Sequence, residues 1–212
     1  CVFVRLGLIG STKTLHLNDA RGINTEEAHN KPRLEVMSGV HTHDSIENIA
    51  HPDNPVLQGE HYAALDLVPE VQATHVAVAE GGWSSRATWR DGQIPESGSR
   101  VLIPDGIAVE VDDQFTAALD WIRINGELRF STTVDTELRV DTLVSAPGSR
   151  LQIGTPDQPV NAGVNARVVF ADRGPLSVAE DPMLLGRGAI LHGATVVHGH
   201  AKTSALTSAE QL

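Results

Sequence analysis

The stretch SAPGSRLQIGT, residues 145–155, places a short alternating segment directly after a glycine. The same arrangement occurs earlier in IPDGIAVEV at 103–111 and in INGELRF at 124–130. The glycines of the three segments are spaced 20 and 22 residues apart: Gly106, Gly126 and Gly148. A repeat of this length that carries strand patterns and no helical pattern is typical of a β-solenoid.

The repeated segments alternate apolar and polar residues, so one row of side chains from each should point inward. The expected inward residues are Ile122, Ile124, Leu128, Phe130, Leu138, Val140, Leu151 and Ile153. The expected outward residues are Arg123, Glu127, Arg129, Glu137, Arg139 and Gln152. Stacked coils would join the inward rows into one core, and glycine would allow left-handed backbone conformations at the corners.

The pattern predicts an all-β fold for the chain from Trp83 onward. The expected strands are 101–103, 107–111, 119–124, 127–130, 137–144, 150–153, 165–171, 189–191 and 195–197. The dipeptide Asn125-Gly126 is a hairpin signal, which leaves a β-sandwich or jelly roll as the alternative architecture. The nearly constant spacing of the glycines favours the solenoid.

Residues 1–82 have a different texture and read as a partly irregular lead. VFVRLGLI at 2–9 predicts a strand, and EHYAALDLV at 60–68 predicts a short helix. HPDNP at 51–55 predicts a break in regular structure.

Composition narrows the function classes. The net charge of −11 argues against a nucleic-acid partner, whose recognition needs a basic surface. The single cysteine, Cys1, excludes an internal disulfide, and no apolar run approaches the roughly 18 residues of a membrane span. The sequence has no phosphate loop, dinucleotide fingerprint, nucleophile elbow or zinc-protease helix. Nucleotide-dependent catalysis is therefore not expected.

Five pieces of the sequence carry a family resemblance when taken in order. They are Trp89…Asp91-Gly92…Pro95…Gly98, Ile103-Pro104-x-Gly106, Ile124-x-Gly126-x-Leu128-x-Phe130, Leu151-x-Ile153-Gly154-Thr155 and His198-Gly199. Residues 83–206 resemble the G8 domain, a module of fibrocystin-like, hyaluronan-depolymerising and bacterial extracellular proteins. Two positions depart from the pattern: Gly148 stands where many members have a glycine pair, and Ala205 stands where members often have tryptophan.

The resemblance implies a right-handed parallel β-helix at 83–206, with 1–82 as lead and 207–212 as a truncated linker to a further β-helix of the same polypeptide. It also implies an extracellular or cell-surface module that binds a polysaccharide, anionic or neutral, or forms part of a protein that processes one. A structural cap that nucleates a longer β-helix stalk or adhesin is one alternative, and a metal-dependent hydrolase or lyase is another. The chain carries no initiator methionine, so we expect any signal peptide to lie outside it.

Two groups of residues are candidates for metal binding. His41, His43 and Glu47 have part of the spacing of a cupin-type site for a divalent ion such as zinc, although loop-like flanks fit exposed histidines as well. The acidic turns that contain Asp91, Asp105, Asp112 and Asp113 would suit calcium, and they also fit ordinary turn chemistry.

Histidines and arginines supply the other candidates. His192 and His198, each followed by glycine, are candidate catalytic proton carriers or turn caps. Arg123, Arg129 and Arg139 could fork onto a sugar carboxylate, or could pair with neighbouring acids. Among Trp83, Trp89 and Trp121, Trp89 is the ligand-binding candidate, and its alternative role is to plug the open end of the solenoid. Asp91 completes the expected ligand-binding set.

Overall fold

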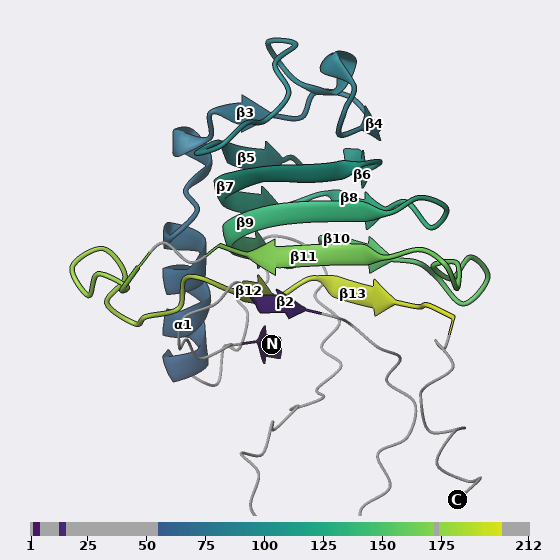
Figure 1. Ribbon diagram of the computed structural model, residues 1–212. Coiled ribbons are helices and arrows are strands. Elements are labelled where there is room, and N and C mark those ends of the chain that lie inside the picture. Colours follow the sequence, from purple (N-terminus) through teal and green to yellow (C-terminus); the bar gives the residue numbers. More distant parts are fainter. Residues whose placement is uncertain (1, 5–12, 16–54, 172–173, 201–212) are drawn as a thin grey trace, which may run out of the picture.

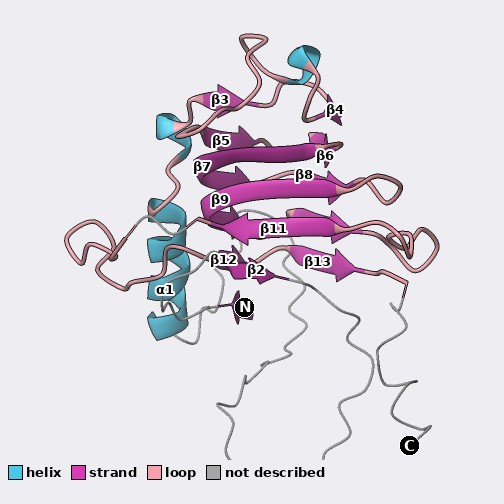
Figure 2. Ribbon diagram, in the orientation of Figure 1, coloured by secondary structure: helices cyan, strands magenta, loops and turns pink. Residues whose placement is uncertain are grey.

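Strands dominate the computed structural model, which describes residues 2–4, 13–15, 55–171 and 174–200. The described strands form two sheets, one of eight strands and one of five. One α-helix, α1 (Pro55–Asp66), lies along one side of the stacked strands (Figures 1 and 2). Two short 3-10 helices, Glu70–Gln72 and Arg86–Thr88, belong to the connections. The predicted all-β class is confirmed.

The larger sheet contains the long strands, and we call it the long-strand sheet. Its order is β1-β12-β9-β7-β5-β3, with β11 pairing both β9 and β2. Its strands are β1 (Val2–Val4), β2 (Lys13–Leu15), β3 (His75–Val76), β5 (Arg100–Ile103), β7 (Gln114–Ile124), β9 (Thr136–Ser145), β11 (Ala166–Phe170) and β12 (Ala189–Leu191). The pairs from β3 to β12 are parallel, whereas β1 and β2 pair antiparallel with β12 and β11.

The second sheet, which we call the short-strand sheet, has the order β13-β10-β8-β6-β4. Its strands are β4 (Gly81–Gly82), β6 (Ala108–Val111), β8 (Glu127–Phe130), β10 (Arg150–Ile153) and β13 (Ala194–Val197). All four pairings are parallel, and Leu128 lies in register between Val109 and Leu151. From β3 to β10 the chain therefore passes alternately through the two sheets.

Asn125-Gly126 does not form the hairpin that its sequence signals. It carries the chain from β7 in one sheet to β8 in the other, and β8 pairs with β6 and β10. The Asn125 and Gly126 N–H groups both donate to the Ile103 carbonyl, one level earlier in the stack. Tertiary pairing with the preceding level thus overrides the local turn preference.

The predicted inward rows form the core between the sheets. All eight residues are buried and belong to one cluster: Ile122, Ile124, Leu128, Phe130, Leu138, Val140, Leu151 and Ile153. Burying a side chain of this size contributes about 1.5–3 kcal/mol relative to its exposed state. The stacked aliphatic rows therefore supply the main favourable free energy of this fold.

The three repeat glycines serve two different purposes. Gly106 and Gly148 have φ of 75° and 82°, so they use the left-handed conformation expected of a corner. Gly126 has no such φ; instead, a Cβ there would collide with the carbonyl oxygens of Pro104 and Ile107. Close backbone approach, not a left-handed turn, is what requires glycine at position 126.

Two tryptophans close the end of the core at β3 and β4. Trp83 and Trp89 are 0% and 2% exposed, and their rings meet edge to face with centroids 4.9 Å apart. The Trp89 indole N–H donates to the Trp83 carbonyl at 2.9 Å. The Trp89 ring thus lies almost fully buried against Trp83 in the core.

The helix begins earlier than the sequence pattern indicates. Pro55, at the end of the expected break, is its first residue, because proline fits the first turn, where no N–H donor is needed. Ala64 of α1 and Val68, just after the helix, are fully buried. They pack against Trp121, Val144 and Ile190 of the long-strand sheet. This apolar contact fixes the C-terminal end of α1 over the outer face of that sheet.

Candidate functional site

A break in the strict alternation of β7 creates the first half of the site. Leu119 and Ile122 both face the core, so two residues, Asp120 and Trp121, lie between them instead of one outward residue. Both of these side chains line a pocket on the outer face of the sheet. A bend of the strand thus places a carboxylate and an indole side by side.

The neighbouring strand β9 repeats this arrangement one level further along. Val140 and Leu143 face the core, while Asp141 and Thr142 line the same pocket. Leu119 pairs with Val140, and Trp121 pairs with Thr142, so the two bends are in register. The outer face therefore presents a two-by-two block of pocket-forming side chains.

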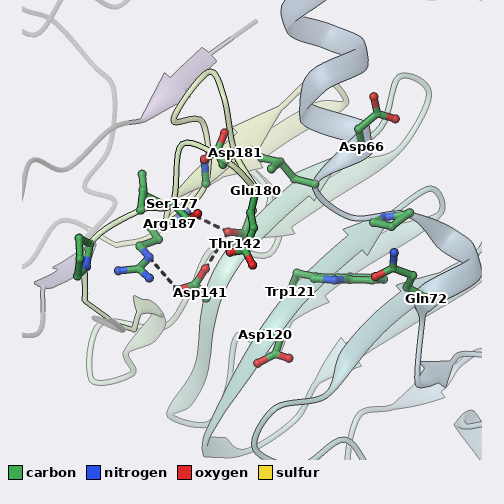
Figure 3. Close-up of a pocket in the computed structure, with 15 residues that line it drawn as sticks. Asp66, Gln72, Asp120, Trp121, Asp141, Thr142, Ser177, Glu180, Asp181 and Arg187 are labelled. Atoms are coloured by element: carbon green, nitrogen blue, oxygen red, sulfur yellow. Dashed lines mark hydrogen bonds and ion pairs between the residues drawn. The ribbon is translucent and has the colours of Figure 1, made fainter.

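Two other segments build walls around this block (Figure 3). The end of α1 and the 3-10 helix after it contribute Asp66, Leu67, Pro69 and Gln72. The loop between β11 and β12 contributes Pro175, Leu176, Ser177, Glu180, Asp181, Gly186 and Arg187. The pocket is open to solvent on one side, and its volume of about 400 Å³ is within the range of small-ligand sites.

Hydrogen bonds shape the loop that forms one of these walls. The buried Asp181 carboxylate accepts the Leu185 and Gly186 N–H groups at 3.0 and 2.8 Å. The Arg187 N–H donates to the Thr142 hydroxyl at 2.9 Å, and Arg187 Nε lies 3.4 Å from Asp141 Oδ1. These contacts fix the loop to β9.

The same loop holds two residues in a costly backbone conformation. Leu184 and Arg187 have φ of 53° and 60°, and both are non-glycine residues. The left-handed region costs such residues about 1–2 kcal/mol each. Strain of this kind concentrates at functional sites, so it adds to the evidence from the pocket.

The charge of the lining is strongly negative. Five carboxylates face or border the pocket, against one guanidinium: Asp66, Asp120, Asp141, Glu180 and Asp181, with Arg187. Trp121, 6% exposed, supplies part of an apolar wall. Carboxylates accept hydrogen bonds from hydroxyl and amine groups and repel other anions. The pocket thus suits a hydroxyl-rich ligand without negative charge.

Of the predicted arginines, Arg123 lies on the outer face of the long-strand sheet and is already engaged. Its Nη2 is 2.8 Å from Glu70 Oε1, and its side chain is 15% exposed. It also donates to Asn125 Oδ1 and to the Val68 carbonyl. Burial lowers the pKa of the Arg123 guanidinium, while Glu70 and Asp66 oppose that shift. Arg123 holds the segment after α1 against β7.

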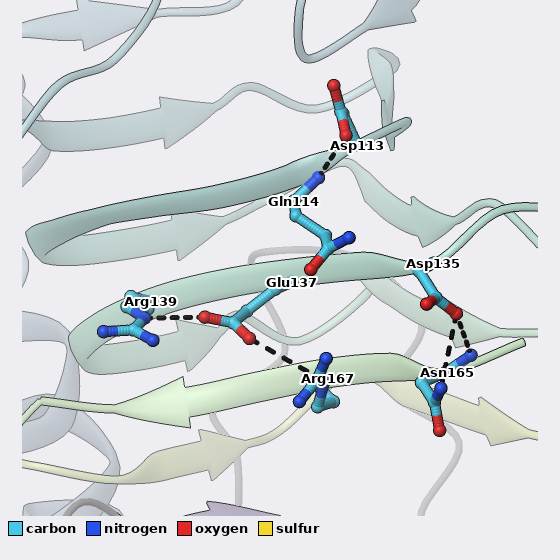
Figure 4. A network of polar contacts seen from close by, with 7 residues as sticks. All are labelled: Asp113, Gln114, Asp135, Glu137, Arg139, Asn165 and Arg167. Atoms are coloured by element: carbon cyan, nitrogen blue, oxygen red, sulfur yellow. Dashed lines mark hydrogen bonds and ion pairs between the residues drawn. The ribbon is translucent and has the colours of Figure 1, made fainter.

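Arg139 belongs to a separate network on the same sheet (Figure 4). Its Nε donates to Glu137 Oε1 at 2.6 Å, and Arg167 Nε of the adjacent β11 lies 3.7 Å from Glu137 Oε2. Glu137 points outward as predicted but is buried beneath these two arginines. Arg139 thus pairs with an acid of its own strand, and Arg123 pairs with an acid of the 3-10 helix Glu70–Gln72, not with acids of a neighbouring strand.

Arg129 lies on the other sheet, in register between Glu110 and Gln152. The three predicted arginines are thus divided between two outer faces and do not form one anion-binding cluster. Asp91 is exposed after the tryptophan plug, near His75. Burial lowers the pKa of His75, and Glu96 and Asp91 partly offset that effect.

The predicted catalytic pair is split between the sheets. His192 follows β12, and His198 follows β13, where its backbone bonds to Ile153 and Val160. The structure instead joins His192 to His61 of α1, with their Nδ1 atoms 3.0 Å apart. His61 carried no recognisable signal in the sequence, because helical periodicity cannot reveal a partner 131 residues away.

The described residues show no metal-binding geometry for the predicted metal ligands. His41, His43 and Glu47 lie outside the described residues. Within the part of the chain that the structure describes, no group of three or more His, Cys, Asp or Glu is placed to hold a metal ion. Asp112, of the acidic turns, instead accepts the N–H and hydroxyl of Ser84 at 3.0 and 2.6 Å.

A sequence signal for the pocket was present but indirect. LDWIRI at 119–124 and VDTLVS at 140–145 repeat an aspartate after an apolar residue, 21 positions apart. Trp121 is one of the three tryptophans that the sequence offers for contact with a sugar ring. The walls from α1 and from residues 175–187 were not predictable, because they depend on tertiary docking.

Fold and pocket together define an all-β domain of two parallel sheets with a ligand-sized cavity on one outer face. The chain belongs to the G8 domain family, whose model matches residues 88–209. The human protein Fibrocystin-L is 27% identical to it over 160 residues, which cover 73% of this chain. The chain spans about 4% of the length of that relative. No solved structure matches the chain significantly. Among the described helices, none is long and apolar enough to cross a membrane.

Proposed function

We propose that this G8 domain binds a neutral glycan in the pocket formed by β7, β9, the end of α1 and the loop at 175–187. The observation that carries the proposal is the cavity of about 400 Å³, where an indole wall adjoins several carboxylates. Sugar rings combine apolar faces with many hydroxyl donors, so they match such a lining.

The charge of the pocket supports a neutral glycan over an anionic one. A uronate or sulfate would enter a lining with five carboxylates and one arginine, and Arg187 already contacts Asp141. Like charges at these distances are repulsive. The proposal is therefore a neutral ligand, and the arginines on the strands stabilise the fold.

We also propose a fold type and a location for the domain. We take the alternation of the chain between two parallel sheets to be a right-handed parallel β-helix, with 83–206 as its domain and 1–82 as its lead. The family of this chain supports an extracellular or cell-surface location. A role in a metal-dependent hydrolase or lyase stays a prediction.

The test is calorimetric titration of the protein with neutral, uronate-bearing and sulfated oligosaccharides. We expect saturable binding of a neutral oligosaccharide, weakened by Asp120→Asn or Glu180→Gln and unchanged by Glu110→Gln on the short-strand sheet. Glu110→Gln is the matched control, since it removes the same charge far from the pocket. Binding confined to uronate or sulfate, or equally weakened by Glu110→Gln, would contradict the proposal.

A second candidate function, a structural cap for a longer β-helix, is favoured by the edge of β13. The Ala194 N–H donates to the Ser149 carbonyl just before β10, and the His198 N–H donates to Ile153 at its end. By alternation, the N–H groups of Thr195 and Val197 point to the other edge. No strand among the described residues pairs with that edge. At the opposite end Trp83 and Trp89 close the core.

The cap role is tested by fusing the chain ahead of a parallel β-helix that lacks its own N-terminal end. A cap should raise the unfolding temperature of the fused helix. Thr195→Pro should abolish that gain, because proline at this position blocks the open edge without removing a bond to β10. An unfolding temperature that does not rise would exclude this role.

A further inference from the structure

A pair of buried histidines makes a polar contact between α1 and the residue after β12. His61 is 6% exposed and His192 is 9% exposed. Their Nδ1 atoms are 3.0 Å apart, and the rings are nearly perpendicular, at 89°, with centroids 4.3 Å apart. The contact joins the middle of α1 to the residue that follows β12.

This geometry requires a particular protonation state. A hydrogen bond between two Nδ1 atoms needs one ring to donate its N–H and the other to accept with a bare nitrogen. If both rings are protonated to imidazolium, every ring nitrogen is a donor, so two N–H groups face each other at Nδ1 and two cations lie in contact in a buried place. The contact therefore tolerates one shared proton between the two nitrogens but not two.

The helix that carries His61 is also a wall of the pocket. Ala64 and Val68 pack on Trp121, Val144 and Ile190, and Trp121 is itself part of the lining. A helix of 12 residues is marginal in isolation, so α1 depends on this docking. Loss of the histidine contact would loosen the wall that contributes Asp66 and Leu67.

We propose that the His61–His192 contact is an acid-sensitive latch, which holds α1 on the long-strand sheet near neutral pH and releases it when both rings are protonated. The latch regulates the pocket of the proposed function and rests on that function for its biological meaning. Histidine pairs at packed interfaces are suited to this role, because imidazole gains its proton just below neutral pH.

Other titratable groups on the surrounding elements do not replace the pair. Within the described residues, α1 carries Glu60, Tyr62 and Asp66, β9 carries Glu137, Arg139 and Asp141, and β12 carries none. The Tyr62 ring meets His61 with centroids 5.7 Å apart.

The test is hydrogen–deuterium exchange of the ligand-free protein at pH 7.5 and pH 5.5, corrected for the intrinsic pH dependence. We expect amides of α1 to exchange at least about tenfold faster at pH 5.5. One pH unit changes the ratio of protonated to neutral imidazole tenfold, which sets this lower bound. Amides of β8 and β10, which lie in the other sheet, should keep their protection. Equal protection of α1 at both pH values would overturn the latch.

Two variants separate the latch from a general effect of acid. His61→Leu with His192→Leu replaces both partners by apolar groups, which can preserve packing and removes the titration. This double variant should keep α1 protected at both pH values, while His200→Asn, at an exposed histidine, should behave as the parent protein. The latch is wrong if the double variant folds and still loses α1 protection at pH 5.5.

The measurement is independent of the ligand. If glycan titration fails at pH 7.5 while α1 responds to acid, the proposed function fails and the latch stands. If a glycan binds at pH 7.5 and equally at pH 5.5, with unchanged α1 exchange, the latch fails and the proposed function stands.

Discussion

The two sheets have matching inner faces and very different outer faces. Inside, both contribute aliphatic rows to a single core. Outside, the long-strand sheet bears α1 and the loop between β11 and β12 (Figure 1), with a pocket lined by both. The short-strand sheet bears Glu110, Arg129 and Gln152 in register. The repeated strands thus form the scaffold, and the positions that depart from the repeat form the site.

The departure has a specific structural origin. Strands β6, β8 and β10 have four residues each, while β7 and β9 have eleven and ten. Only the longer strands have room for a bend at which two consecutive residues face outward. Asp120-Trp121 and Asp141-Thr142 occupy those bends and form the pocket floor.

The largest expected effect concerns the shared core. Leu128→Ala in the short-strand sheet and Leu138→Ala in the long-strand sheet should each lower the free energy of unfolding by about 2–5 kcal/mol, because each leaves a cavity among buried residues. Urea denaturation measures both. Similar losses would support one core, whereas a loss for only one variant would show that the two inner faces contribute unequally to stability.

The next effect concerns the outer faces and ligand affinity. Asp120→Asn should weaken glycan binding by about 10- to 100-fold, since a charged acceptor typically contributes about 1.5–3 kcal/mol to its hydrogen bond. Glu110→Gln should leave affinity unchanged. Titration calorimetry gives both values, and equal effects of the two substitutions would remove the functional distinction between the faces.

A smaller effect concerns the arginines. Arg123→Ala should lower the free energy of unfolding by about 1 kcal/mol, because its ion pair with Glu70 is only partly shielded from solvent. Arg129→Ala should stay within about 0.5 kcal/mol, because the buried Nε of this half-buried residue has no hydrogen-bond partner among the described residues. Urea denaturation of both variants compares them. A larger loss for Arg129→Ala would show that the ladder face is the more tightly organised one.

The smallest effect is a pH dependence at β3. The folded-state pKa of His75 is lowered, mainly by burial, so folding favours its neutral form. The stabilisation is present above the unfolded value of about 6.5 and declines as pH falls below it. His75→Asn should slightly flatten the fall in melting temperature between pH 7.5 and 5.5. An unchanged slope would show that His75 takes no part in it.

Much of the scaffold could be predicted from the sequence, because the inner rows obey a period of two and the corners carry glycine. The expected strands from 101–103 to 195–197 all occur within a few residues of their predicted bounds. The short strands β3 and β4 were missed, since two residues cannot display a period. The hairpin signal at Asn125-Gly126 is misleading, because β8 pairs with β6 and β10 and not with β7.

The site could be predicted only in fragments. Trp121 and the repeated aspartates are visible in the sequence, but a strict alternation would point Asp120 and Trp121 to opposite faces. The His61–His192 contact and the pocket walls join segments far apart in the chain, and no local pattern encodes such contacts. The arginines were visible, but their acidic partners Glu70 and Glu137 determine what they do.

The central claim is that successive levels of the chain stack in parallel, with the outward bends of β7 and β9 in register. Methyl–methyl nuclear Overhauser contacts on protein labelled at isoleucine, leucine and valine test this most directly. We predict contacts from Leu128 to both Val109 and Leu151, its neighbours in β6 and β10. Contacts from β8 to β7 in an antiparallel hairpin about Asn125-Gly126, without those to Val109 and Leu151, would contradict the account.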